Sequence, residues 1–417
     1  MKKFFFIAAA VVAMVACTKT EVQFDETADS NKIGFEVANY AAQTKADPVA
    51  LTNADDALYQ FHTYAYQFPK LGDAVEFMNT DIFAWSENMA AKVTSGTSIY
   101  VWAPENDYYW PKTGWINFYS YAGTLAPAES VSADKKTVTL AYENKTVAAT
   151  DNIMVADAAL RFNANQETYK VDGTEGSAHV TKGVPTLFRH MLAKLKMDVK
   201  IQIPADKVSA NTIWKVEILD GYDIDGNSAI ADAEKSQIYP VNKGTLTLEN
   251  ADALAANATL NTTTQQWNRT QTGADVVSGW KPGDTNELIQ LHADNVLTLP
   301  VSQTESTATE ELLEMRTVMP QLTQNVAFKL IYKVQALHGS DVFMEEIRTV
   351  GIDVDADLYD LIGSIAQWES NKKITYHIII DPVSEKVTFD PAVEAYDEVE
   401  ANADDVININ NNGIVTP

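Results

Sequence analysis

The chain has 417 residues, of which 46% are hydrophobic and 10% aromatic, enough for two or three folded domains. Its 57 Asp and Glu residues outnumber 31 Lys and Arg residues, and the formal net charge of −26 opposes binding to nucleic-acid phosphates. The high aromatic content and the modest 21% of charged residues also exclude a disordered chain. These numbers predict a folded, acidic, soluble ectodomain.

The N-terminus has the parts of a secretory signal. Lys2 and Lys3 precede an apolar run of 13 residues, Phe4–Ala16, which is too short to span a bilayer. The only cysteine, Cys17, follows directly, so the chain can form no internal disulfide and no cysteine-based zinc site. Met14-Val15-Ala16-Cys17 resembles the lipobox of bacterial lipoproteins, with Met14 in place of the usual Leu.

The lipobox resemblance implies a signal peptide of residues 1–16 that is cleaved between Ala16 and Cys17, and a diacylglyceryl group on the Cys17 thiol. Acyl chains such as palmitate anchor a protein at about 0.8 kcal/mol per buried CH₂. The alternative is an ordinary signal peptide followed by a chance cysteine. We expect an exported lipoprotein that is held at the outer membrane.

The remainder of the chain has the patterns of β-strands. Apolar and polar residues alternate at 137–140, 195–203, 214–218, 245–248, 326–334 and 374–378. Gly- and Asx-rich turn signals such as Asp220-Gly221 separate these runs. Helical patterns are few, at 309–316 and 355–365. We predict an all-β fold of two antiparallel β-sandwich domains, transthyretin-like, with few short helices.

A domain boundary is expected near Gly183-Val184-Pro185, because the preceding stretch, 163–181, is polar and contains two glycines. The predicted divisions are a signal peptide at 1–16, an N-terminal propeptide or strand segment at 17–45, an N-terminal β-sandwich at 46–184, and a C-terminal β-sandwich at 185–417 with a tail that is a candidate donor strand.

Motifs of catalysis and cofactor binding are missing from the sequence. The six histidines are scattered, and there is no HExxH, nucleophile elbow, Walker loop or dinucleotide fingerprint. Asp223 and Asp225 start a stretch with Glu234 at position 12 of a calcium loop, but Gly226 falls at position 4 instead of 6. We interpret this stretch as an acidic turn and expect a non-enzymatic protein with no catalytic residue, cofactor or metal.

Four segments, in order, resemble the fimbrillin-like family of Bacteroidales, the type V pilus subunits. They are W-P-K-T-G-W-I-N-F-Y-S-Y at 110–121, F-R-H-M-L-A-K-L-K at 188–196, M-P-Q-L at 319–322 and W-E-S-N-K-K-I-T-Y at 368–376. With the lipobox, these segments are spread over most of the length of the chain. His190 within the second segment is expected to be a satisfied core or edge residue.

This resemblance implies assembly by donor-strand exchange, in which a trypsin-like protease removes an N-terminal segment and a strand of a neighbouring subunit fills the exposed groove. Ile33, Phe35 and Val37, preceded by Val22 and Phe24, have the alternation of a strand that occupies the groove before cleavage.

The predicted cleavage site lies between Lys45 and Ala46, where the family has Thr-Arg-Ala. Alternatively, Lys45 is an ordinary loop lysine and the subunit stays on the membrane as an anchor. The tail at 399–417 is either a donor strand, with Ile407 and Ile409 alternating with asparagines, or an acidic surface tail. A stalk subunit needs both groove and donor strand, whereas a tip subunit needs only the groove.

The aromatic cluster at 108–121 has two interpretations, a sandwich core or an exposed platform for a sugar or host ligand. The function predicted from all of these features is a structural or adhesive subunit of a cell-surface fimbria, whose partners are other subunits of the same pilus. The alternative is an outer-membrane lipoprotein that binds glycans through exposed rings.

Overall fold

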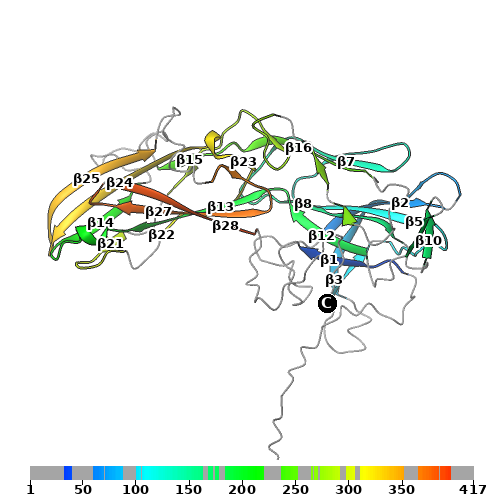
Figure 1. Cartoon of the computed structure of the whole chain (residues 1–417), viewed down its shortest axis with the longest axis horizontal. Coiled ribbons are helices and arrows are strands. Elements are labelled where there is room, and N and C mark those ends of the chain that lie inside the picture. The colour runs from blue at the N-terminus through cyan, green and yellow to red at the C-terminus, as the bar shows by residue number, and fades with distance from the viewer. Residues whose placement is uncertain are drawn as a thin grey trace, which may run out of the picture.

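The computed structural model describes residues 32–39, 60–69, 71–87, 100–104, 106–162, 168–171, 174–177, 184–219, 236–251, 264–265, 267–270, 273–291, 297–305, 310–351, 365–384 and 386–395. These residues form an elongated molecule of two β-rich halves placed end to end (Figure 1). Within these ranges there is no helix with the length and apolar character needed to cross a bilayer.

One half contains a nine-stranded sheet. Its main path is β1 (Phe35–Asn39), β12 (Val184–His190), β8 (Ile153–Ala156), β5 (Trp115–Gly123), β2 (Gln60–Phe68), β3 (Val75–Glu87) and β4 (Tyr100–Pro104). Off this path, β9 (Ala158–Phe162) pairs with β5, and β17 (Thr264–Gln265) pairs with β9. Both faces of this sheet are apolar, and each contributes to a separate hydrophobic core.

A five-stranded sheet covers one of these faces. Its strands are β18 (Asn268–Arg269), β16 (Lys243–Ala251), β7 (Thr137–Thr146) and β6 (Ala128–Val131), with β19 (Trp280–Pro282) also paired to β16. The core between the two sheets combines rings from the larger sheet, such as Tyr66 and Tyr119, with aliphatic side chains such as Leu140 and Leu246 from the smaller one. The two sheets therefore form a sandwich.

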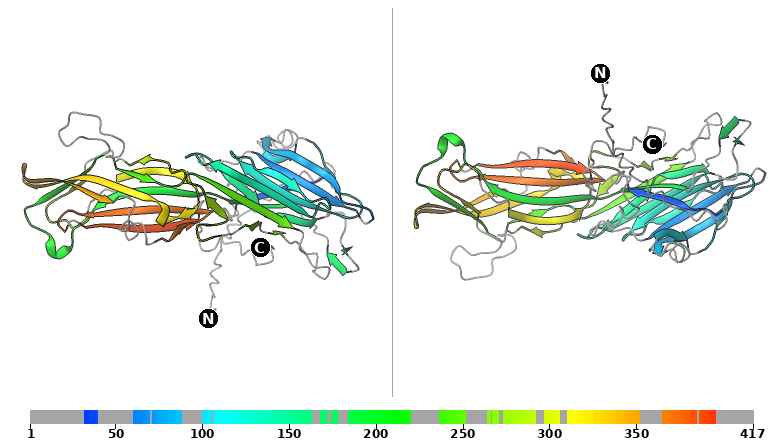
Figure 2. Two further views of the ribbon diagram at one scale, coloured as in Figure 1. Left: turned by 90° about the horizontal axis from the view of Figure 1, so that it is seen from above. Right: turned by 90° about the horizontal axis from the view of Figure 1, so that it is seen from below.

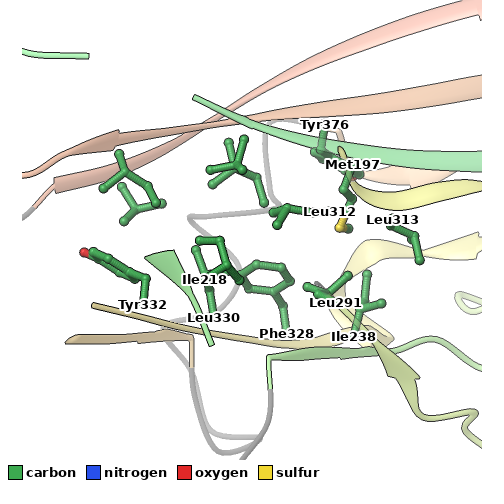
Figure 3. Packing of buried hydrophobic residues seen from close by; sticks show 14 of the residues in the cluster. Met197, Ile218, Ile238, Leu291, Leu312, Leu313, Phe328, Leu330, Tyr332 and Tyr376 are labelled. Atoms are coloured by element: carbon green, nitrogen blue, oxygen red, sulfur yellow. The ribbon is translucent and has the colours of Figure 1, made fainter. Parts of the chain in front are cut away.

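The other half is a second sandwich. One sheet is β22 (Glu310–Val318), β13 (Ala193–Ile201), β27 (Lys372–Asp381) and β28 (Lys386–Ala395). The opposite sheet is β20 (Ile289–Gln290), β15 (Gln237–Tyr239), β24 (Ala327–His338), β14 (Ile213–Ile218) and β21 (Leu297–Leu299), with β25 (Asp341–Gly351) on β24. Figure 3 shows Met197 and Tyr376 of the first sheet facing Phe328 and Leu330 of the second.

Four shorter strands and two 3-10 helices are the remaining described elements. The hairpin β10 (Thr168–Val171)–β11 (Thr174–Ser177) and the pair β23 (Gln321–Leu322)–β26 (Gln367–Trp368) are antiparallel. The 3-10 turns are η2 (Ala205–Lys207) and η4 (Thr323–Asn325).

The predicted all-β class is confirmed, and each alternating run lies in a strand except at two ends: Gln202 and Ile203 follow β13, and Val326 precedes β24. The buried side chains of β24 and its entry, Phe328, Leu330, Tyr332, Val334 and Val326, are those that the alternation assigns to one face. Most sheet pairings are antiparallel, but two are parallel. These are β1 with β12 and β13 with β27.

The helix expected at 309–316 is wrong, because Glu310–Val318 is strand β22. Its strong helix formers, Glu, Leu, Met and Arg, favour a helix locally. In the fold, however, the segment pairs antiparallel with β13, and irregular register near Met197 lets the adjacent residues Leu312 and Leu313 both become buried. Long-range pairing and burial thus override the local preference. The second expected helix, at 355–365, lies outside the described residues except for Ile365.

The chain crosses from one half to the other three times. The crossings are the links from β12 to β13, from β15 to β16 and from β19 to β20. Strand β16, although late in sequence, pairs along β7 of the N-terminal half. Both views of Figure 2 show the two halves joined lengthwise, with green strands of mid-chain residues at the centre. The division of the chain at residue 184 stays a prediction.

Candidate functional site

Strand β1 covers an apolar face of the nine-stranded sheet. Phe35 is 3% exposed, and its ring centroid lies 5.7 Å from that of Phe61 and 5.5 Å from that of Phe118. Phe61 belongs to β2 and Phe118 to β5, neither of which is a sheet neighbour of β1. The sheet therefore curls, and β1 crosses its own sheet's face, as the dark blue strand does in the right view of Figure 2.

The backbone of this N-terminal segment is held from both sides. On one side, β1 pairs parallel with β12 from Phe35↔Val184 to Asn39↔Phe188, and the Val184 amide donates to the Gly34 carbonyl at 2.7 Å. On the other side, the Ile33 amide donates to the Tyr108 carbonyl at 2.8 Å. Ile33 is 2% exposed, and burial of a side chain of this size contributes roughly 1.5–3 kcal/mol.

A surface ion pair adds little to this attachment. Lys32 Nζ lies 2.5 Å from Asp107 Oδ1, but the side chains are 40% and 56% exposed. Solvent-exposed pairs of this kind contribute about 0–1 kcal/mol. Backbone pairing and the burial of Ile33 and Phe35 therefore hold the segment.

Beneath β1 the floor is largely aromatic. The buried residues that form this core with Ile33 and Phe35 include Phe61, Phe118, Phe188, Trp110 and Ile116. Rings meet at tilted or edge-on angles, for example Phe61–Phe188 at 5.5 Å and 63°. The site thus consists of an apolar floor beside the edge of β12, and it is filled here by a strand of the chain itself.

The second region of interest is the turn between β12 and β13, where three of the four resembling segments meet. The Asn371 amide donates to the Leu192 carbonyl at 3.0 Å, and the Asn371 Oδ1 accepts the His190 amide at 3.3 Å. His190 is fully buried, and its Nδ1 lies 3.0 Å from Asn152 Oδ1. The prediction that His190 is a satisfied core residue is confirmed.

Gln321, from the M-P-Q-L segment, binds another connection between the two halves, the link from β15 to β16. Its Oε1 accepts the Val241 amide at 2.9 Å, and its Nε2 donates to the Val241 and Met319 carbonyls, each at 3.0 Å. Gln321 and Met319 are fully buried, and Met319 belongs to the core of the N-terminal half. The resembling segments therefore include residues that join the two halves.

The aromatic cluster at 108–121 is mainly core. Trp110, Phe118, Tyr119 and Tyr121 are buried, Tyr108 and Trp115 are half-buried, and Tyr109 is 42% exposed. Phe68 stacks on Trp115 at 5.3 Å and 8°, which covers one face of that indole. This burial confirms the sandwich-core interpretation for most of the rings.

Several predicted site residues lie outside the described residues. They are Ala16 and Cys17, the candidate cleavage residues Lys45 and Ala46, the upstream residues Val22 and Phe24, the tail 399–417, and the acidic turn with Asp223, Asp225 and Glu234. In the part of the chain that the structure describes, no three His, Cys, Asp or Glu residues are grouped so as to hold a metal ion.

Glu129 on β6 is a site residue that was not predicted from the sequence. Its two carboxylate oxygens each accept a tyrosine hydroxyl, from Tyr64 on β2 and Tyr121 on β5. Burial and the hydrogen bond to Glu129 raise the pKa of the Tyr121 hydroxyl, which therefore keeps its proton and donates it. No sequence signal identifies this contact, because Glu129 lies in a polar edge strand and meets Tyr64 only after the two sheets pack.

No family model matches the chain, and no curated protein matches it. Among solved structures, it is similar to a fimbrial protein from Bacteroides vulgatus, at 16% identity over 88% of this chain and 100% of that one, with a TM-score of 0.44. It is also similar to a protein assigned to cell adhesion from Bacteroides uniformis, at 14% identity, 88% and 99% coverage and a TM-score of 0.35. The tip fimbrial protein Mfa3 from Porphyromonas gingivalis matches at 11% identity, 82% and 95% coverage and a TM-score of 0.28.

Proposed function

We propose that this protein is a non-enzymatic structural or adhesive subunit of a cell-surface fimbria of the type V kind. It is exported as a lipoprotein, with Cys17 acylated and anchored in the outer membrane. Cleavage between Lys45 and Ala46 then releases residues 17–45, and a strand of another subunit enters the groove that is left. Its partners are subunits of the same fimbria.

The single observation that carries this proposal is the position of β1. The strand precedes Lys45 in sequence, so cleavage there separates it covalently from the rest of the protein. It buries Ile33 and Phe35 on an aromatic floor and pairs with the edge of β12. Loss of the segment would expose that floor and leave backbone groups of β12 unpaired, and both costs favour the entry of a replacement strand.

The motif-bearing junction supports a role in a fibre. Hydrogen bonds from the buried Gln321 and the half-buried Asn371 tie the two halves together, and the core of the N-terminal half includes Met191, Leu192 and Met319. Inter-domain motion is limited where an interface is hydrophobic and hydrogen-bonded. A subunit with such a junction keeps a fixed orientation between its two ends, which a regular fibre requires.

The test uses the purified protein without its signal peptide. Incubation with trypsin should give a ladder of polymers on a gel run without boiling, and mass spectrometry should show Ala46 as the new N-terminus. Lys45→Gln should abolish both results, whereas Lys207→Gln, which changes an exposed lysine in η2, should leave both unchanged. Mass spectrometry of the protein from cells should also show lipid on Cys17.

A competing peptide tests the groove itself. A synthetic peptide of residues 32–39 should suppress the ladder, and the same peptide with Ser in place of Ile33 and Phe35 should not. Trimmed protein that stays monomeric, with every sheet closed by its own residues, would contradict the proposal. Retention on a polysaccharide gel without any polymer would favour the glycan-binding alternative.

A further inference from the structure

Two tyrosines of the N-terminal half share one carboxylate. Tyr121 on β5 donates its hydroxyl to Oε1 of Glu129 at 2.5 Å, and Tyr64 on β2 donates its hydroxyl to Oε2 of the same residue. Glu129 comes from β6, in the opposite sheet of the sandwich. The two phenol oxygens are therefore held close together, with a common base between them.

The two rings are also neighbours in the sheet. Tyr64 pairs directly with Tyr119, and Tyr121 pairs with His62, so Tyr64 and Tyr121 are diagonal partners on one face of β2 and β5. Their ring centroids are 6.5 Å apart and the ring planes differ by 25°. Tyr64 is 6% and Tyr121 is 7% exposed, so a radical on either ring meets the other ring more readily than a ring of a second protein molecule.

This geometry suits a specific reaction. One-electron oxidation of a tyrosine removes an electron from the ring and the proton from the hydroxyl, and a hydrogen-bonded carboxylate is positioned to take that proton. Here the same carboxylate serves both hydroxyls. The resulting radicals carry spin on the ring carbons next to the phenol oxygen, and two such carbons form a bond when the rings approach.

We propose that Tyr64 and Tyr121 are an oxidative cross-linking site, which forms an intramolecular dityrosine when a haem peroxidase and hydrogen peroxide act on the folded protein. Each tyrosine loses one electron and one hydroxyl proton, and a bond forms between one Cε atom of each ring. Each ring then transfers its Cε proton to its oxygen, which restores both phenols. The two electrons and two protons reduce one hydrogen peroxide to two waters.

The neighbouring pair Tyr66 and Tyr119 serves as an internal comparison. Its centroids are 6.3 Å apart, but the rings are tilted by 53°, and the Tyr119 hydroxyl accepts a hydrogen bond from Asn117 Nδ2 at 3.4 Å. The distances of the two pairs are similar, so a preference for Tyr64–Tyr121 reports the effect of Glu129 and of ring orientation. The new bond would fasten β2 to β5 across 57 residues of chain.

The experiment treats the purified folded protein with a haem peroxidase and hydrogen peroxide. We expect monomeric protein lighter by two hydrogens, dityrosine fluorescence, and a cross-linked peptide that joins Tyr64 to Tyr121. Tyr64→Phe should abolish that peptide. Glu129→Gln should reduce its initial rate of formation at least fivefold, and Tyr109→Phe, which changes an exposed tyrosine, should leave the rate unchanged.

Each variant is compared only after its circular dichroism and thermal midpoint show that the fold persists. If Glu129→Gln does not fold, Glu129→Asp, whose shorter carboxylate reaches less far, replaces it with the same expectation. The proposal is overturned if N-acetyltyrosine couples in the same mixture while the Tyr64–Tyr121 peptide is missing. It is also overturned if the Tyr66–Tyr119 product dominates, or if the carboxylate variants react as fast as the unmodified sequence.

Discussion

The hydroxyl of Ser370 donates a hydrogen bond to the carbonyl oxygen of Met191 at 2.9 Å, although the two residues are 179 positions apart in the chain. The same carbonyl accepts the indole Nε1 of Trp280 at 2.6 Å. Met191 lies in the turn that leads from the sheet of one half to the sheet of the other. Two distant segments therefore fix the conformation of this turn through one backbone oxygen.

A double-mutant cycle measures what this shared acceptor contributes. Ser370→Ala and Trp280→Phe each leave the Met191 carbonyl with one donor, whereas the double variant leaves a buried carbonyl with neither. An unsatisfied buried carbonyl costs about 1–3 kcal/mol. We therefore expect the double variant to lose about 1 kcal/mol more unfolding free energy than the sum of the single losses, measured by urea denaturation. Simple additivity would show that the two bonds act independently.

The strands of the second sandwich were predictable because their side chains alternate strictly. Leu195, Met197, Val199 and Ile201 on β13 point into the core. Of the residues between them, Lys196 and Lys200 remain half-exposed, whereas Asp198 is only 9% exposed. A period of two is a local property that the sequence displays directly. The helix predicted at 309–316 is wrong for the opposite reason, since strand β22 forms there by pairing with β13, whose residues lie more than 100 positions away.

Part of the candidate groove was also predictable. The alternation of Ile33 and Phe35 indicates a strand with one buried face, and both residues are buried. Its parallel pairing with Val184–Phe188 was not predictable, because no periodic signal specifies which strand lies beside which. The Gln321 contacts with Val241 could not be predicted from the sequence either, because they form only when the two halves meet.

Phe35→Ala tests how strongly β1 is held. The substitution removes a ring that is 3% exposed and packs on Phe61 and Phe118. Phe→Ala changes in cores cost about 3–5 kcal/mol, and here the loss falls on the attachment of β1. We expect the Val184 amide, which donates to the Gly34 carbonyl, to exchange its hydrogen more than tenfold faster in mass-spectrometric exchange.

The matched control for this measurement is Leu71→Ala, which truncates a side chain that is 89% exposed in the turn before β3. Its effect on stability should stay within about 0.5 kcal/mol. Equal exchange at Val184 in Phe35→Ala and in the unmodified protein would mean that backbone pairing alone holds β1.

Tyr376 gives the protein an alkaline sensitivity with a defined sign. Burial raises the pKa of its hydroxyl to about 12, against the lowering effect of the hydrogen bond that Trp368 Nε1 donates to it at 3.0 Å. Its pKa is about 10 in an unfolded chain, so the folded state holds the proton more tightly. This contribution is complete below pH 10 and is lost as the pH rises from about 10 to 12.

Urea denaturation between pH 8 and pH 11.5 checks this expectation. One tyrosine contributes at most about 1.4 kcal/mol of lost stability per pH unit. Tyr376→Phe should therefore be less stable at pH 8, because the Trp368 indole loses its acceptor, but should show a shallower decline above pH 10. Tyr109→Phe, at a position that is 42% exposed, should decline as the unmodified protein does. A parallel decline in all three proteins would contradict the assignment to Tyr376.

Gly114 and Gly273 form a natural pair for separating backbone strain from steric overlap. Both have positive φ, +84° and +95°, a region that costs an L-residue roughly 1–2 kcal/mol. A Cβ at Gly114 would lie 2.2 Å from the Phe68 carbonyl oxygen and 2.9 Å from the Pro69 Cα, whereas a Cβ at Gly273 would meet nothing within 4 Å. We expect Gly273→Ala to cost about 1–2 kcal/mol in urea denaturation. Gly114→Ala should cost a further 1–3 kcal/mol, because the start of β5 must move away from the end of β2. Equal losses in the two variants would show that φ alone requires glycine in the W-P-K-T-G-W segment.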